Sequence, residues 1–168
     1  MKKLLLISNI LIFAFPALGW AGGCNTWDVY QADKKWQDAI GTNEADVVVD
    51  LYAYNAVLLP TFSVQIIDNQ ADRFQYFKKL FTEIDELTVE YDGERYIQFV
   101  EGGAISSGDY TFRGQVHSDG DFVETPARFT FVYKQHKHEE DGGCKLELIT
   151  HHSSEQPFGS KITQLLAQ

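Results

Sequence analysis

The sequence predicts an α+β domain in which three helices precede a curved antiparallel sheet of about five strands. The first observation is a change in the spacing of apolar residues, which is helical up to about residue 84 and alternates from Leu87 onward. The second is a series of turn sequences in the later half, such as Asp92-Gly93 and Gly102-Gly103. Because such short connections make neighbouring strands antiparallel, the two observations indicate one helical layer packed on one sheet.

The three helices are expected at residues 26–40, 45–54 and 69–84. The first carries Trp36 on its apolar face, and Gly41 is expected to end it. The third has a stripe of phenylalanine and leucine side chains that must be buried against another layer.

The strands are expected after the third helix, with a short earlier strand that Pro60 ends. They cover residues 87–91, 95–100, 104–113, 122–136 and 146–153. Alternate side chains of a strand share a face, so the last three strands predict one apolar face with His152 at its end and an opposite, more polar face that includes Arg128. The apolar face consists of Tyr110, Phe112, Phe129, Phe131, Tyr133, Leu146 and Leu148. A β-bulge would exchange these faces locally.

Residues 1–21 have the pattern of a secretory signal peptide. Lys2 and Lys3 give it a positive start, residues 4–15 form an apolar stretch, and small residues precede the expected cleavage after residue 21. A stretch of this length is too short to cross a bilayer of about 30 Å, and no later stretch reaches 18 apolar residues. We therefore expect a secreted or periplasmic protein with no transmembrane segment.

The remaining chain is expected to form one domain, residues 22–157, followed by a tail, residues 158–168. Its two cysteines allow two interpretations. Cys24 either pairs with Cys144 in an oxidising compartment, which we favour, or it is the lipid-modified residue of a lipoprotein. The two interpretations exclude each other.

The net charge of −10 becomes −12 when Lys2 and Lys3 leave with the signal peptide. Such a charge argues against a nucleic-acid-binding protein, which needs a basic surface. The aromatic content of 14% argues against intrinsic disorder, because it supplies enough apolar area for a folded core.

Four segments carry a resemblance to a known family. They are residues 50–61 (DLYAYNAVLLPT), 107–112 (SGDYTF), 126–133 (PARFTFVY) and 151–157 (HHSSEQP). Together they resemble bacterial proteins related to the calcium/calmodulin-dependent protein kinase II association domain, within the nuclear transport factor 2-like superfamily. The resemblance covers roughly residues 30–157.

The resemblance implies a cone-shaped, cystatin-like α+β fold with a pocket between helices and sheet. It also implies self-association into dimers or larger rings. The chain departs from the family before the last strand, where residues 143–146 replace the usual Lys-Trp, and an arginine position of the kinase association domain aligns with Phe131. Because no glycine-rich nucleotide loop and no Asp-Phe-Gly motif is present, we expect neither kinase activity nor a cofactor.

The candidate ligand-binding residues are those expected at the pocket: Trp36, Tyr54, Tyr110, Arg128 and His152. His152 is the best candidate for a general base or a ligand donor, and the alternative is a histidine satisfied by neighbouring groups. Arg128 has the geometry to bind a carboxylate, and the alternative is a salt bridge to Glu147 or Asp109.

Three functions remain open at this point. The leading hypothesis is a secreted, non-catalytic domain that associates with itself and holds a small ligand. A small enzyme of the ketosteroid isomerase or polyketide cyclase kind, using His152, is the alternative. A metal-binding accessory protein, using His136 and His138 in an acidic loop, is the third, although a metal site needs further converging ligands.

Overall fold

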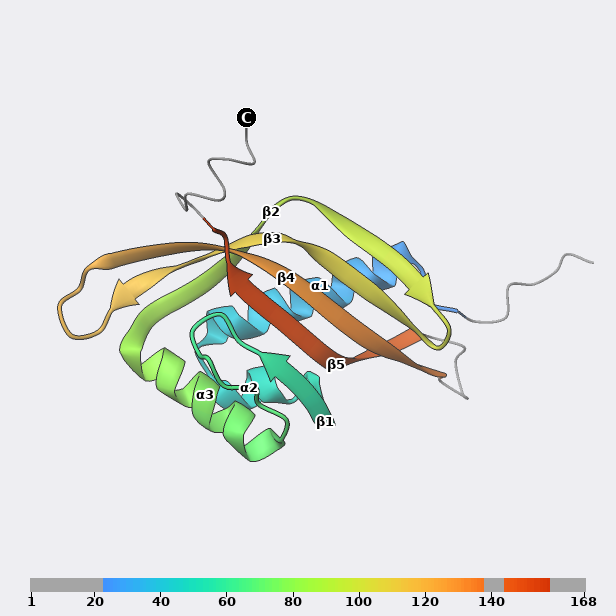
Figure 1. Ribbon diagram of the computed structural model, residues 1–168, viewed down its shortest axis with the longest axis horizontal. Coiled ribbons are helices and arrows are strands. Elements are labelled where there is room, and N and C mark those ends of the chain that lie inside the picture. Colours follow the sequence, from blue (N-terminus) through green and yellow to red (C-terminus); the bar gives the residue numbers. More distant parts are fainter. Residues whose placement is uncertain (1–22, 138–143, 158–168) are drawn as a thin grey trace, which may run out of the picture.

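The structure, a computed structural model, describes residues 23–137 and 144–157. The elements follow the order α1 (Thr26–Thr42), α2 (Ala45–Val49), β1 (Tyr52–Leu59), α3 (Gln70–Glu83), β2 (Ile84–Val100), β3 (Gly103–Val116), β4 (Phe122–Lys137) and β5 (Cys144–Glu155). Figure 1 shows one curved sheet with α1 lying behind it and α2 and α3 at one end. The predicted α+β class and helix-then-sheet order are confirmed.

The five strands are arranged in the order β1-β5-β4-β3-β2. The pairs from β2 to β5 are antiparallel, as predicted, whereas β1 runs parallel to β5. The two strands expected at residues 87–91 and 95–100 are one strand, β2, whose register with β3 shifts between Asp92 and Tyr96. A bulge of this kind bends a strand without ending it.

The helix predicted for residues 45–54 is wrong in its second half. α2 ends at Val49, and Tyr52 already pairs with Leu148 of β5. The apolar side chains there satisfy a helical spacing equally well, but the edge of β5 offers backbone partners that local sequence does not reveal.

Arg73 of α3 stabilises the part of β1 that does not pair with β5. The register of β1 with β5 is interrupted between Tyr52 and Val57. The buried guanidinium of Arg73 donates hydrogen bonds to the carbonyl oxygens of Ala53 (2.8 Å), Tyr54 (2.9 Å) and Ala56. It thereby satisfies acceptors that the sheet leaves without partners.

α1 is fixed at both ends by local hydrogen bonds. The Asn25 side chain accepts from the backbone of Trp27 and Asp28, and the Asp28 carboxylate accepts from the Asn25 N–H in return. The helix continues past Gly41 and ends at Asn43, whose φ of 57° gives the left-handed C-cap expected at Gly41. Asparagine tolerates this conformation through local hydrogen bonding.

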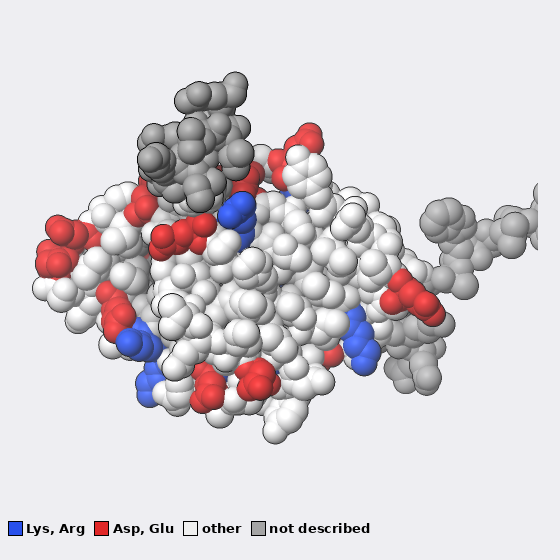
Figure 2. All heavy atoms as spheres, in the orientation of Figure 1, with Lys and Arg blue, Asp and Glu red and all other residues white. Residues whose placement is uncertain are grey.

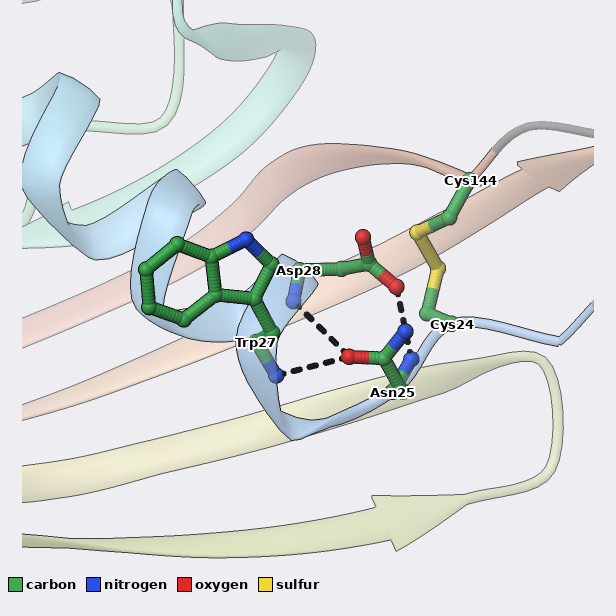
Figure 3. The surroundings of a disulfide bond; sticks show 5 residues. All are labelled: Cys24, Asn25, Trp27, Asp28 and Cys144. Atoms are coloured by element: carbon green, nitrogen blue, oxygen red, sulfur yellow. Dashed lines mark hydrogen bonds between the residues drawn. A yellow bond between two sulfur atoms is a disulfide. The ribbon is translucent and has the colours of Figure 1, made fainter.

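A disulfide between Cys24 and Cys144 joins the start of α1 to the start of β5 (Figure 3). The two Cα atoms lie 5.1 Å apart and 120 residues apart in sequence. Closing a loop of this length stabilises the fold by about 3–5 kcal/mol in the chain-entropy model. The structure thus agrees with the disulfide interpretation of Cys24, because a sulfur in a disulfide is not free for lipid modification. The predicted signal peptide and tail lie outside the described residues.

Candidate functional site

A bulge in β5 exchanges the predicted faces of the two adjacent histidines. Tyr133 pairs with Leu148 and Val132 pairs with Thr150, so Ile149 is an extra residue in β5. Beyond it, His151 points into the core and is buried, while His152 is exposed on the outer face. The prediction that His152 lies on the apolar inner face is therefore wrong.

His151 belongs to a chain of buried hydrogen bonds that begins at Trp36. The Trp36 Nε1 donates to the Tyr52 hydroxyl at 2.9 Å, and that hydroxyl lies 2.7 Å from His151 Nδ1. An indole nitrogen can only donate, so the Tyr52 proton remains available for Nδ1. This arrangement places the imidazole proton of His151 on Nε2.

The chain continues from His151 toward the loop after β1. His151 Nε2 lies 3.3 Å from the Tyr110 hydroxyl, which donates to Ser153 Oγ at 2.5 Å. Ser153 Oγ in turn contacts the hydroxyl of Thr61. When every hydrogen bond of the chain runs in the same direction, from Trp36 toward Thr61, each group donates to the next one. Every donor in the network then has an acceptor.

Burial determines the protonation states in this network. Burial lowers the pKa of His151 to about 3, with the nearby His152 adding to the effect. It raises the pKa of Tyr110 and of Tyr52 well above the usual range of tyrosine. At neutral pH the three side chains are uncharged and act as fixed hydrogen-bonding groups.

The interior beside His151 is almost filled. The cavity beside His151 and Ser153 has a volume of about 10 Å³, and Trp36, Phe77 and Phe112 form part of its wall. A space of this size is at the limit for one water molecule, whereas sites for small organic ligands measure roughly 300–1,000 Å³. The Trp36 indole occupies the interior, stacked against Tyr110 and touching Phe131 and His151 edgewise or at a tilt.

A larger groove lies on the other side of Trp36, between α1 and the start of β5. It has a volume of about 440 Å³ and is open to solvent. Residues of both charge signs line it, and so does Cys144 of the disulfide. The charged residues are Lys35, Lys145, Asp28, Asp50 and Glu147. Trp36 therefore separates the groove from the polar network.

A second buried polar cluster surrounds Asp33 of α1. Its carboxylate accepts hydrogen bonds from Ser106 (2.8 Å), Tyr133 (2.8 Å) and Arg95 (3.1 Å). The Arg95 guanidinium also lies over the rings of Tyr30 and Tyr91. Burial raises the pKa of Asp33, and the hydrogen bonds and the Arg95 charge oppose that effect. The cluster fastens α1 to the sheet.

The five predicted ligand-binding residues do not meet at one place. Trp36 and Tyr110 are in the buried network. Tyr54 is 81% exposed on β1, and Arg128 and His152 are exposed on the outer face of the sheet. Arg128 makes no salt bridge within the described chain, where Glu147 accepts from His136 instead.

The predicted metal site is only partly within the described residues. His136 Nε2 lies 2.8 Å from a Glu147 carboxylate oxygen, and His138 belongs to residues 138–143, which the structure does not describe. Among residues 23–137 and 144–157, no three His, Cys, Asp or Glu side chains converge. In the same ranges, no helix is long and apolar enough to span a membrane.

Sequence reasoning missed Asp33, Arg73 and His151. A signal for the first two was present, since Asp33 lies on the same helical stripe as Val29 and Trp36, and Arg73 precedes Phe77 by four residues. A charged residue on an apolar stripe is a candidate for a buried, paired group. His151 was assigned to the wrong face because the bulge has no evident sequence signal.

Comparison with solved structures agrees with this geometry. A protein from Xanthomonas campestris, provisionally assigned as a calcium/calmodulin-dependent protein kinase II association domain, superposes with a TM-score of 0.68 and 29% identity over 81% of this chain and 91% of that one. A nuclear transport factor 2-like superfamily protein from Salmonella enterica serovar Typhimurium superposes with a TM-score of 0.66 and 11% identity, over 80% of this chain and 93% of that one. The chain has a nuclear transport factor 2-like fold.

The same nuclear transport factor 2-like fold also occurs in a ketosteroid isomerase-like protein from Erwinia carotovora, with a TM-score of 0.62 and 12% identity over 77% of this chain and 94% of that one. No protein-family model matches the sequence, and no curated protein matches it. The resemblance to kinase association-domain proteins is thus confirmed, and the fold itself is shared by proteins with different names and reactions.

Proposed function

We propose that the chain is an extracytoplasmic domain that associates with copies of itself through the outer face of its sheet and catalyses no reaction of its own. The observation that carries the proposal is a broad uncharged area on that face of an otherwise acidic protein. The signal-peptide pattern of residues 1–21 and the disulfide support the extracytoplasmic location.

The uncharged area consists of two rows of residues that cross the sheet from edge to edge. In the register of the strands, one row is Val57, Thr150, Val132, Ile105 and Gln98, and the next is Leu59, His152, Thr130, Ser107 and Tyr96. Neither row contains a lysine, arginine or carboxylate. Six of the ten residues are β-branched or small, and such side chains form a surface that a second sheet can pack against.

Charged residues are found in the rows on either side. Asp92, Asp109 and Arg128 are aligned on one side, and Lys134 and Glu147 are aligned on the other. Figure 2 shows the sheet side of the molecule, with the charged groups gathered around its margin. A centre depleted of charged residues, surrounded by a polar rim, is the usual anatomy of a protein interface.

The surface is suited to an isologous dimer, because the same rows on two copies present similar side chains to each other. Bringing two chains of net charge −12 together is opposed by repulsion, and an interface that excludes carboxylates from its centre keeps that repulsion small. The family resemblance, which implies dimers or rings, points the same way.

The small cavity beside His151 favours the assembly function over the alternative of an enzyme of the ketosteroid isomerase or polyketide cyclase kind. The cavity of about 10 Å³ leaves no room for a substrate beside His151. The low pKa of His151 also makes it a poor proton acceptor near neutral pH. His152, the predicted base, lies in the proposed interface.

Sedimentation equilibrium on the chain from residue 23 tests the proposal. Val132→Arg places a charge in the centre of the uncharged rows and is expected to raise the dissociation constant of the dimer at least tenfold. Val64→Arg, in the exposed loop before α3, is the matched control and is expected to leave it unchanged. Equal masses for the two variants at all concentrations would contradict the proposed interface.

A further inference from the structure

β2 is an edge strand of the sheet, and its second half is an open hydrogen-bonding edge. We propose that two copies of the chain also pair through this edge, antiparallel, about a two-fold axis at Gln98. This goes beyond the proposed association through the sheet face, because it uses the backbone hydrogen-bonding groups at the edge of β2 and joins the two sheets into one. The kind of partner is a second copy of this chain.

The two halves of β2 differ in how their edge is protected. The first half contains two register shifts, carries Glu90 and Asp92, and has Glu86 at a φ of 50°. Such bulges and charges are what proteins use to prevent edge pairing. Residues 96–100 have none of these features, and three of their four apolar members are exposed: Tyr96 by 71%, Phe99 by 51% and Val100 by 47%.

The side chains select one register. With the axis at Gln98, Ile97 faces Phe99 of the second copy and Tyr96 faces Val100. Moving the axis to Ile97 places Arg95 opposite Phe99, and moving it to Phe99 places Ile97 opposite Glu101. Only the axis at Gln98 pairs apolar with apolar side chains at both positions.

The backbone is compatible with the same register. In an antiparallel ladder, alternate residues direct their N–H and C=O groups to one side of the strand. Two residues that face each other across an axis at Gln98 differ by an even number of positions. A residue whose N–H and C=O point to the free edge of β2 therefore faces a residue of the second copy whose N–H and C=O also point to its free edge. The open edge of each copy is thereby satisfied by the other.

A cysteine at the axis tests the pairing directly. Both native cysteines are in the disulfide, so Gln98→Cys introduces the only thiol of the chain from residue 23. Residues that face each other in an antiparallel pair have Cα atoms about 4.5–5.5 Å apart, within reach of a disulfide. Mild oxidation is expected to convert most of this variant to a covalent dimer on a non-reducing gel.

Three control variants separate the edge from the sheet face. Val64→Cys, in the exposed loop before α3, lies in neither proposed interface and is expected to stay monomeric on the gel. Adding Phe99→Lys to Gln98→Cys is expected to lower the dimer yield at least fivefold, whereas adding Thr130→Arg is not. The edge proposal is overturned if Gln98→Cys does not cross-link, and this result would leave the proposed association through the sheet face untouched. It is also overturned if the cross-link of Gln98→Cys is abolished by adding Thr130→Arg but not by adding Phe99→Lys.

Discussion

Tyr52 is the residue that joins Trp36 to His151 in the buried network. Its hydroxyl accepts from the indole and donates to the imidazole, so both neighbours depend on it. Sequence alone does not indicate this role, because Tyr52 and Tyr54 are two residues apart and have the same side chain. Their environments differ completely: the first is buried and the second is exposed.

Tyr52→Phe is expected to destabilise the protein by about 2–4 kcal/mol, because it leaves the Trp36 and His151 nitrogens buried without partners. Tyr54→Phe, the matched control, is expected to change the free energy of unfolding by less than about 0.5 kcal/mol. Urea denaturation followed by circular dichroism measures both. Equal small effects would show that the hydrogen-bonded chain contributes little to stability.

The low pKa of His151 predicts a pH dependence of stability. In the folded protein His151 stays neutral down to about pH 3, whereas in the unfolded chain the same side chain takes up a proton near pH 6.5. Between these values the unfolded state binds more protons, so this group's contribution is present above pH 6.5 and is lost as the pH falls, by about 1.4 kcal/mol per unit.

We therefore expect the stability difference between the unmodified protein and His151→Gln to shrink as the pH is lowered from 6.5 to 4. Asp33 and the other carboxylates titrate in both proteins, so their contributions cancel in the difference. Val64→Ala, which removes no titratable group, is the control and is expected to give a difference that does not depend on pH. Parallel stability curves for the unmodified protein and His151→Gln would contradict a neutral, buried His151.

At the scale of the element, β1 is the strand most dependent on a side chain from elsewhere. Arg73 of α3 supplies hydrogen bonds to three of its carbonyl oxygens, and its own Nε has no hydrogen-bond partner in the described structure. The strand therefore depends on packing of α3 as well as on pairing with β5. A buried cation that binds only carbonyl oxygens is costly to desolvate, so its contacts must be retained.

Arg73→Met is expected to cost about 2–4 kcal/mol, because the carbonyl oxygens of β1 lose their donors. Lys78→Met on the exposed side of α3 serves as the control and is expected to be nearly neutral. Hydrogen exchange should show faster exchange in residues 52–59 of the Arg73 variant than in the control. Unchanged protection of β1 would show that pairing with β5 is sufficient to hold it.

The helices and the antiparallel strands were predictable from the sequence because their patterns are local. α3 covers Gln70–Glu83, one residue inside each end of the predicted range, and four strands follow alternation and turn residues. The short strand that Pro60 ends was predicted, but the start of β1 at Tyr52 and its parallel pairing were not, since its partner β5 is about 90 residues away in the chain. The bulge at Ile149 was likewise set by tertiary pairing, and it moved the inward histidine from His152 to His151.

At the scale of the whole molecule, the fold combines a filled interior with an uncharged outer face. A ligand site would be expected inside the cone, yet aromatic side chains occupy it and leave about 10 Å³. The exposed features instead lie on the sheet: two uncharged rows and an open edge at β2. Because an uncharged surface and an edge with exposed apolar side chains stand out on an acidic domain, we infer that they are covered by other copies.

The central claim is that the protein works as an assembly, and its mass in solution tests that claim most directly. Sedimentation equilibrium of the disulfide-bonded chain from residue 23, at micromolar concentration and neutral pH, is expected to give a mass of two or more chains. A single species with the mass of one chain, up to about 100 μM, would contradict the account.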